Sequence, residues 1–173
     1  MPEVNEQGGE TAGREFVITR EFDAPREMVF QAWTEPDRLA QWMSPKGFAT
    51  ISTNLDFRAG GTYHYGLRAP NGTDMWGKWT FREIVRPQKL VFTSTFSDEH
   101  GGLTRHPFSA TWPMEMLTTV LFEETNGKTT LTLRWAPINA NAIERETFDA
   151  ALDGMNQGWG GTLDQLSAYL AKQ

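Results

Sequence analysis

The feature that most constrains the fold is a long amphipathic segment at the end of the chain, from Asn141 to about Lys172. Its largely apolar residues recur at intervals of three and four, the period of one face of an α-helix. They are Phe148, Ala151, Leu152, Met155, Trp159, Thr162, Leu163, Leu166, Tyr169 and Leu170. Asn141 and Glu144 stand three residues apart, the spacing of a capping box at the first turn. A one-sided helix of this length needs a broad apolar partner.

Three glycines lie along one flank of this predicted helix. Gly154, Gly158 and Gly161 are spaced at i, i+4 and i+7, so they leave a stripe without side chains. Each glycine inside a helix costs about 1 kcal/mol relative to alanine. Either a strand or loop approaches the helix closely there, or the missing side chains leave room for a ligand. We favour close approach, because glycine usually marks tight packing. Gly160 falls on the opposite, solvated face.

The chain before this helix alternates apolar and polar residues, which is the period of β-strands. Strands are expected at about residues 15–22, 50–57, 62–67, 74–85, 90–96, 114–125 and 128–135. Two short helices are expected after the first strand, one opened by Pro25 and one running from Pro36 to about Trp42. Short gaps between the later strands predict a meander of antiparallel neighbours.

The dipeptide Asn126-Gly127 predicts the register of the last hairpin. It is typical of a two-residue type I′ turn, in which both residues have positive φ. Phe122 should then face Leu131. The strand residues expected to point inward, under the long helix, are Met114, Met116, Val120, Phe122, Leu131, Leu133 and Trp135. Glu115 falls on the other face, which argues against a buried catalytic carboxylate at that position.

These elements predict an α+β fold in which a curved antiparallel sheet of six or seven strands wraps around the long C-terminal helix. One helix cannot fill the hollow of a strongly twisted sheet of that width. The two short helices should plug one end of the hollow. What remains should be a cavity lined by apolar and aromatic side chains.

Composition excludes several classes of protein and site. The 173 residues carry a net charge of -6, with no run of Lys or Arg, which argues against nucleic acid or an anionic membrane as partner. The chain has no cysteine, so disulfides, thiol nucleophiles and zinc-thiolate sites are excluded. Residues 1–13 resemble a disordered tail and residues 14–173 one domain. We expect a soluble, cytoplasmic protein.

The order of elements resembles the helix-grip fold of the START/birch-pollen-allergen (SRPBCC) superfamily. The matching motifs resemble the subgroup similar to the activator of the heat-shock chaperone ATPase. They are Phe22-Asp23-Ala24-Pro25, Val29-Phe30, Ala32-Trp33, Pro36 to Trp42, Asp56 to Gly61, Arg82 to Val85, Pro87, Leu90-Val91-Phe92, Gly158-Trp159 and Leu163 to Leu170. The resemblance implies a fold and a hydrophobic pocket. It implies no reaction, since members range from lipid and hormone binders to aromatases, hydrolases and co-chaperones of the stress response.

The histidines are the main candidates for metal-binding or catalytic side chains. His64 alternates away from the tyrosines beside it and should lie on the solvent face of its strand. His100 and His106 lie in a segment with Asp98 and Glu99, and such a group can hold a metal, although the spacing is unspecific. We favour a solvated loop. His106 beside the cavity would be the best candidate for acid-base catalysis.

The preferred hypothesis is that the cavity binds a small hydrophobic or aromatic molecule, with no catalytic residue, metal or cofactor. The predicted ligand-binding residues are Trp42, Trp79, Phe96, Trp112, Met114, Met116, Met155, Gly158 and Trp159. Tryptophan offers flat apolar surface, and methionine adapts its shape to a ligand. The alternatives are an aromatase- or hydrolase-like enzyme and, by the resemblance alone, a co-chaperone. A homodimer is left open.

Overall fold

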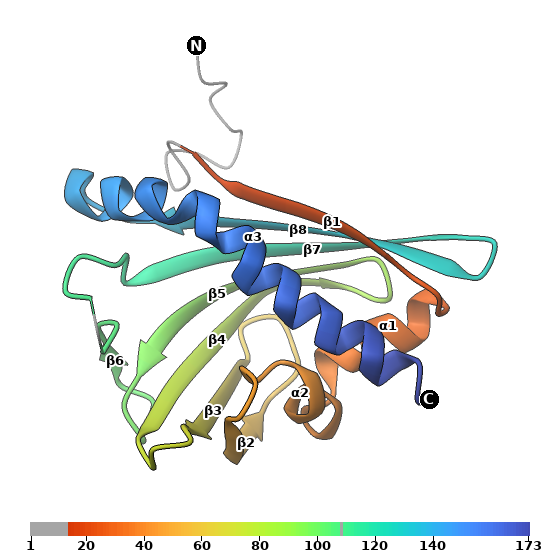
Figure 1. Cartoon of the computed structure of the whole chain (residues 1–173), viewed down its shortest axis with the longest axis horizontal. Coiled ribbons are helices and arrows are strands. Elements are labelled where there is room, and N and C mark those ends of the chain that lie inside the picture. The colour runs from red at the N-terminus through yellow and green to blue at the C-terminus, as the bar shows by residue number, and fades with distance from the viewer. Residues whose placement is uncertain (1–13, 108) are drawn as a thin grey trace.

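The computed structural model describes residues 14–107 and 109–173 (Figure 1), so the predicted tail, residues 1–13, lies outside the described residues. The elements in chain order are β1 (Phe16–Phe22), α1 (Arg26–Thr34), α2 (Pro36–Trp42), β2 (Ala49–Leu55), β3 (Thr62–Arg68), β4 (Asp74–Val85), β5 (Lys89–Ser97), β6 (Leu103–Thr104), β7 (Glu115–Thr125), β8 (Lys128–Ile138) and α3 (Ala142–Leu170). No helix in the described part of the chain is long and apolar enough to cross a membrane.

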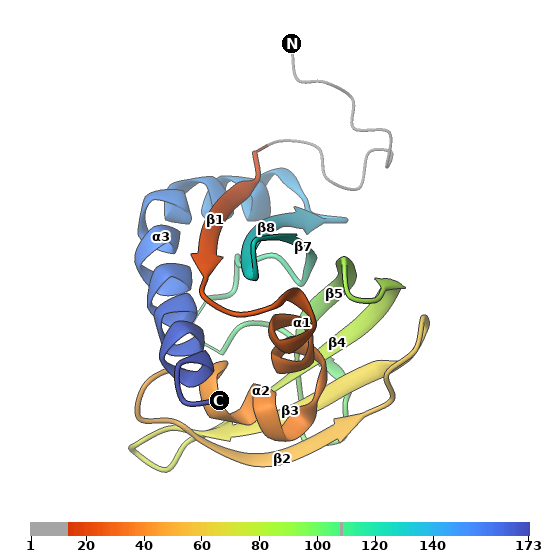
Figure 2. The ribbon, with the colours of Figure 1, turned by 90° about the vertical axis from the view of Figure 1, so that its right-hand side faces the viewer.

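The strands form one open antiparallel sheet, in the order β1-β8-β7-β5-β4-β3-β2, with the two-residue strand β6 paired to β5. The sheet curves, and α3 runs diagonally across its concave face (Figure 1). Viewed from the side, α1 and α2 cover one end of that face (Figure 2). The α+β helix-grip fold predicted from the sequence is therefore confirmed, and β6 is the strand that the sequence pattern did not predict.

The last hairpin has the predicted register. Asn126 and Gly127 have φ values of 54° and 77°, as the type I′ turn requires. Phe122 lies opposite Leu131 and Thr118 opposite Trp135. The inner face of β7 and β8 is thereby turned toward α3.

The long helix begins with the predicted capping box. The backbone N–H of Glu144 donates to Oδ1 of Asn141 over 2.8 Å, and the Asn141 N–H donates to the Glu144 carboxylate over 3.0 Å. One assignment within the helix is wrong: Gly160 is buried, because Arg20 of β1 reaches over it toward Asp164. A Cβ at Gly160 would lie 3.7 Å from the Arg20 guanidinium.

The glycine stripe is not a point of close approach. A Cβ built on Gly154, Gly158 or Gly161 would meet nothing within 4 Å among the described residues. The prediction of tight packing there is therefore wrong. The stripe is exposed because the loop after α2 and the loop before β7 pass beside the helix without covering it.

The end of the sheet below α1 and α2 is solid. Phe122 packs against Phe30 and Trp33, with ring centroids 5.3 and 6.5 Å apart, and all three are at most 1% exposed. Trp42 lies edge-on to Trp33 at 4.9 Å, and its indole N–H donates to the carbonyl of Ala32 over 2.9 Å. We call this region the closed end.

Candidate functional site: an aromatic cavity at the open end

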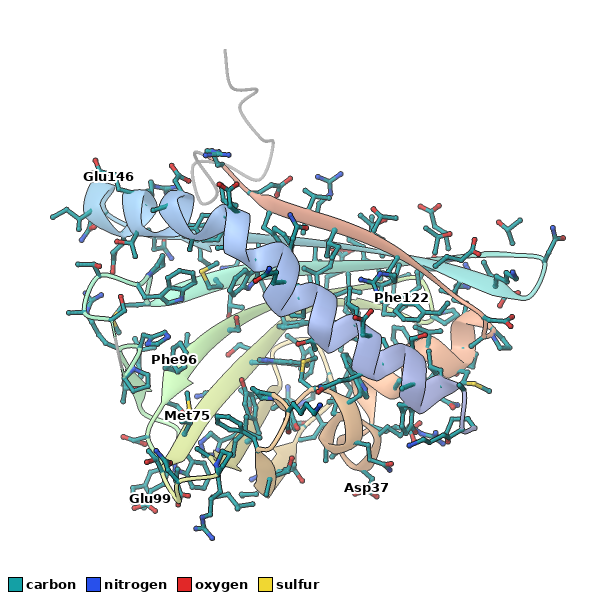
Figure 3. All side chains as sticks on the ribbon, viewed as in Figure 1. Asp37, Met75, Phe96, Glu99, Phe122 and Glu146 are labelled. Atoms are coloured by element: carbon teal, nitrogen blue, oxygen red, sulfur yellow. The ribbon has the colours of Figure 1, made fainter. Side chains whose placement is uncertain are left out.

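The opposite end of the concave face contains a cavity of about 390 Å³. Figure 3 shows the two ends, with Met75 and Phe96 beside the cavity and Phe122 in the closed end. We call the cavity side the open end. Its lining is Met43, Pro45, Tyr65, Leu67, Met75, Trp76, Trp79, Phe92, Ser94, Thr95, Phe96, His106, Trp112, Pro113, Met114, Met116, Thr118, Trp135 and Trp159. Aromatic rings and thioethers form most of this wall.

The floor of the cavity is built by the pairing of β3 with β4. Tyr65 lies opposite Gly77, and a Cβ on Gly77 would come within 2.3 Å of the tyrosine hydroxyl, so only glycine lets the ring lie there. Trp79 stacks on Phe92 at 4.1 Å and lies edge-on to Tyr65, with ring centroids 6.3 Å apart. Burial raises the pKa of Tyr65 to about 12, so this hydroxyl stays protonated at neutral pH.

The outer wall comes from the segment between β6 and β7. The His106 ring lies 4.7 Å from Phe96 and 6.3 Å from Trp112. Burial lowers the pKa of His106, so the imidazole is mainly neutral at pH 7. The geometry therefore offers a neutral histidine among aromatic rings, with no charged side chain in the described lining of the cavity.

An ion pair attaches this segment to the start of α3. Arg105 lies 2.7 Å from the Glu144 carboxylate and also donates to the carbonyl of Trp112 over 3.4 Å. Glu144 is 6% exposed. Its pKa is lowered, first by the backbone N–H of Asn141 and then by Arg105. The helix cap and the cavity wall thus share one carboxylate.

The helix side of the cavity is Trp159, which lies 5.8 Å from Trp135. Beyond it an open groove follows the outer flank of α3, over Ala151, Met155 and the glycine stripe. Cavity and groove share the residues Met43, Pro45, Trp112, Trp135 and Trp159. The groove therefore leads to the cavity past the indole of Trp159.

The structure brings most of the predicted ligand-binding residues together. Trp79, Phe96, Trp112, Met114, Met116 and Trp159 line the cavity. Met155 and Gly158 line the adjoining groove. Trp42 lines neither, because its indole turns into the closed end and donates to the Ala32 carbonyl.

Sequence reasoning missed several wall residues, among them Tyr65, Met75, Ser94 and Thr118. Tyr65 had a usable signal, since it alternates with Tyr63 on one side of the predicted strand. Ser94 and Thr118 had none, because an isolated hydroxyl residue in a strand is ordinary.

The polar segment after β5 forms a turn. The Asp98 carboxylate accepts the backbone N–H groups of His100 and Gly102, each over 2.8 Å, which lowers its pKa. His64 stacks on Trp76 at 5.3 Å, and its ring lies 3.1 Å from the Asp98 carbonyl. Within residues 14–107 and 109–173, no three His, Asp or Glu side chains gather as a metal site would require.

Comparisons with known proteins agree with this architecture. Residues 23–171 match the family model described as Activator of Hsp90 ATPase homolog 1-like protein. A solution structure from Arthrobacter aurescens is 28% identical, covers 92% of this chain and 87% of its own, and has a TM-score of 0.75. A crystal structure from Chromobacterium violaceum is 27% identical, covers 90% and 96%, and has a TM-score of 0.69.

A further crystal structure, of an AHSA1 protein from Silicibacter pomeroyi, shares the fold at 21% identity, with 91% and 98% coverage and a TM-score of 0.69. No curated protein matches the chain.

Proposed function

We propose that this chain, which belongs to the family of Activator of Hsp90 ATPase homolog 1-like proteins, binds a small, flat, apolar molecule in the cavity at its open end. One observation carries the proposal. The cavity measures about 390 Å³, whereas well-packed cores leave few voids larger than a water molecule. Small-molecule sites of proteins are typically about 300–1,000 Å³ and largely apolar.

The chemistry of the wall favours flat ligands. Trp79, Phe96 and Trp112 present aromatic rings, against which a second ring system can stack or pack edge-on. Met75, Met114 and Met116 supply polarisable thioethers whose side chains adapt to the outline of a ligand.

Binding is favoured over catalysis because the described wall contains no acid-base pair. The described lining contains the imidazole of His106 but no Asp, Glu, Lys or Arg side chain. Hydrolases and cyclases commonly use a carboxylate as the base or nucleophile within hydrogen-bond reach of the substrate. An apolar wall with isolated hydroxyls suits retention of a molecule instead.

The experiment is a titration with 1-aminoanthracene, a neutral three-ring dye, followed by dye emission and by quenching of tryptophan. We expect one-to-one saturation in the micromolar range, about −8 kcal/mol. The variant Ser94→Phe places a ring inside the cavity and should abolish binding. The control Thr19→Phe adds the same ring on the exposed outer face of β1 and should leave binding unchanged.

Non-saturable binding, or equal binding to Ser94→Phe and wild type, would contradict the proposal. Near-ultraviolet circular dichroism of each variant verifies that the aromatic side chains remain in a fixed packing arrangement.

The description of the family also motivates a second candidate, interaction with a chaperone ATPase. This role would use the outer surface rather than the cavity. It is tested by measuring the ATPase rate of a purified Hsp90 with and without this protein. A rate that is unchanged at excess protein would remove this candidate.

A further inference from the structure

Two hydroxyl side chains lie on neighbouring strands where the solid core meets the cavity. Ser94 of β5 lies opposite Trp79 and Met116, and Thr118 of β7 lies opposite Phe92 and Trp135. Ser94 pairs with Met116, two residues before Thr118, so the two hydroxyl residues are diagonal neighbours on the concave face. Both residues line the cavity.

Thr118 is the more informative of the two. Its side chain is 1% exposed to solvent, but its hydroxyl is not a buried atom left without a partner; the one such side-chain atom in the described residues is Nε1 of Trp33. The Thr118 side chain borders the cavity instead, where its hydroxyl can meet a molecule held inside. A hydroxyl in an otherwise apolar wall is a group that can orient such a molecule by a hydrogen bond.

From this geometry we infer that the ligand carries a hydrogen-bonding oxygen, a ketone or a phenol, that meets the hydroxyls of Thr118 and Ser94. The inference rests on the proposed function and narrows its ligand class to flat ring systems with a polar oxygen on one edge. The aromatic wall holds the rings, and the two hydroxyls fix their orientation. A hydroxyl both donates and accepts, so it serves a ketone and a phenol alike.

Recognition of this kind discriminates between ligands. A site built to hydrogen-bond an oxygen disfavours an analogue without it, because the buried groups of the site then stay unpaired. A neutral hydrogen bond contributes roughly a threefold to tenfold preference.

The test uses fluorenone and fluorene, two three-ring molecules of nearly equal size that differ in one carbonyl oxygen. Each displaces bound 1-aminoanthracene in a competition titration. Wild-type protein should bind fluorenone about fivefold more tightly than fluorene. Thr118→Val and Ser94→Ala should each reduce this preference and leave the fluorene affinity unchanged.

Two variants serve as controls. Thr118→Ser keeps the hydroxyl and should keep the preference. Thr119→Val makes the same change one residue further, where the side chain alternates to the outer face of the sheet, and it should also keep the preference.

The outcomes separate the two proposals. Equal binding of fluorenone and fluorene to wild type would overturn the inference while leaving the cavity as a binding site. A preference that is undiminished in both Thr118→Val and Ser94→Ala would overturn it as well. Failure of the dye itself to bind would remove the proposed function and this inference together.

Discussion

The two ends of the concave face share one sheet and one helix but differ in what covers them. At the closed end, α1 and α2 bring Phe30 and Trp33 down onto Phe122, and these rings fill the hollow. At the open end the cover is a loop segment and the indole of Trp159, and a cavity remains. Both ends are aromatic, so residue type does not decide which one is hollow.

The difference lies in the elements that carry the aromatic rings. Helices place side chains at fixed spacings over the sheet, and α1 buries Val29, Phe30 and Trp33 within one turn and a half. At the open end, loop residues such as His106 and Trp112 line the cavity without filling it. Loops that carry binding residues on a rigid scaffold follow the same pattern.

The largest expected effect is a difference in the free energy of unfolding between a variant at the closed end and one at the open end. Phe122→Ala removes a ring that is 1% exposed and leaves a void between Phe30 and Trp33, so it should lower the free energy of unfolding by about 3–5 kcal/mol. Phe96→Ala enlarges a cavity that already exists and should cost less than about 2 kcal/mol. Urea denaturation of both variants measures the two losses. Equal losses would show that the open end is packed as tightly as the closed end.

Trp159 tests the open end from the helix side. The indole is partly buried and lies between the cavity and the groove, so Trp159→Ala should cost about 1–2 kcal/mol of stability. It should weaken dye binding about tenfold through the loss of one aromatic wall. Denaturation and dye titration of the same sample measure both quantities. A loss of 3 kcal/mol or more with unchanged dye affinity would place Trp159 in the core instead.

Acid should loosen the open end before the closed end. The pKa of Glu144 in the folded protein lies below its ordinary value of 4.5, so its stabilisation is complete above that pH. The stabilisation is lost as the pH falls through the folded pKa, when Glu144 takes up a proton and its bonds to Asn141 and Arg105 weaken.

We expect Glu144→Gln to lower stability by about 1 kcal/mol at pH 7 and by less at an acidic pH below the lowered pKa, where the wild-type carboxyl is also neutral. Thermal melts at the two pH values measure this difference. The same deficit at both would mean that the charge of Glu144 does not hold the loop.

The glycine stripe should give the smallest effect, and in the opposite direction. Gly158 is exposed and helical, and a Cβ there meets nothing within 4 Å, so Gly158→Ala should raise stability by about 0.5–1 kcal/mol. Gly77→Ala is the contrasting change, because its Cβ would collide with Tyr65 at 2.3 Å and should destabilise the cavity floor. Melting temperatures of the two variants should therefore move in opposite directions. If Gly158→Ala were destabilised instead, a strand or loop would have to approach the helix closely at Gly158.

The sequence predicted this structure best where a regular local pattern has one geometric solution. The capping box at Asn141 and Glu144 and the turn at Asn126-Gly127 are local signals with one geometric solution each, and both are confirmed. The hollow end was expected because a single helix cannot cover a wide twisted sheet.

Other features depended on the course of loops, which carry no periodicity. The groove beside Gly158 is bordered by the loop residues Met43, Pro45, Lys46 and Trp112, so its open flank was not predictable. The position of Trp42 depended on whether its indole N–H would find a partner, and it finds the Ala32 carbonyl inside the core. The place of Thr118 in the cavity wall could not be predicted either, because its burial beside the cavity depends on the assembled sheet.

The most direct test of the open end as a binding site is methionine-methyl NMR during titration with 1-aminoanthracene. The methionines among the described residues sample both ends. Met75, Met114 and Met116 line the cavity, whereas Met28 packs at the closed end. We expect the methyl resonances of Met75, Met114 and Met116 to shift and saturate at one equivalent of dye, while that of Met28 stays in place. Unchanged cavity resonances at saturating dye, or a shift of Met28 alone, would contradict the account.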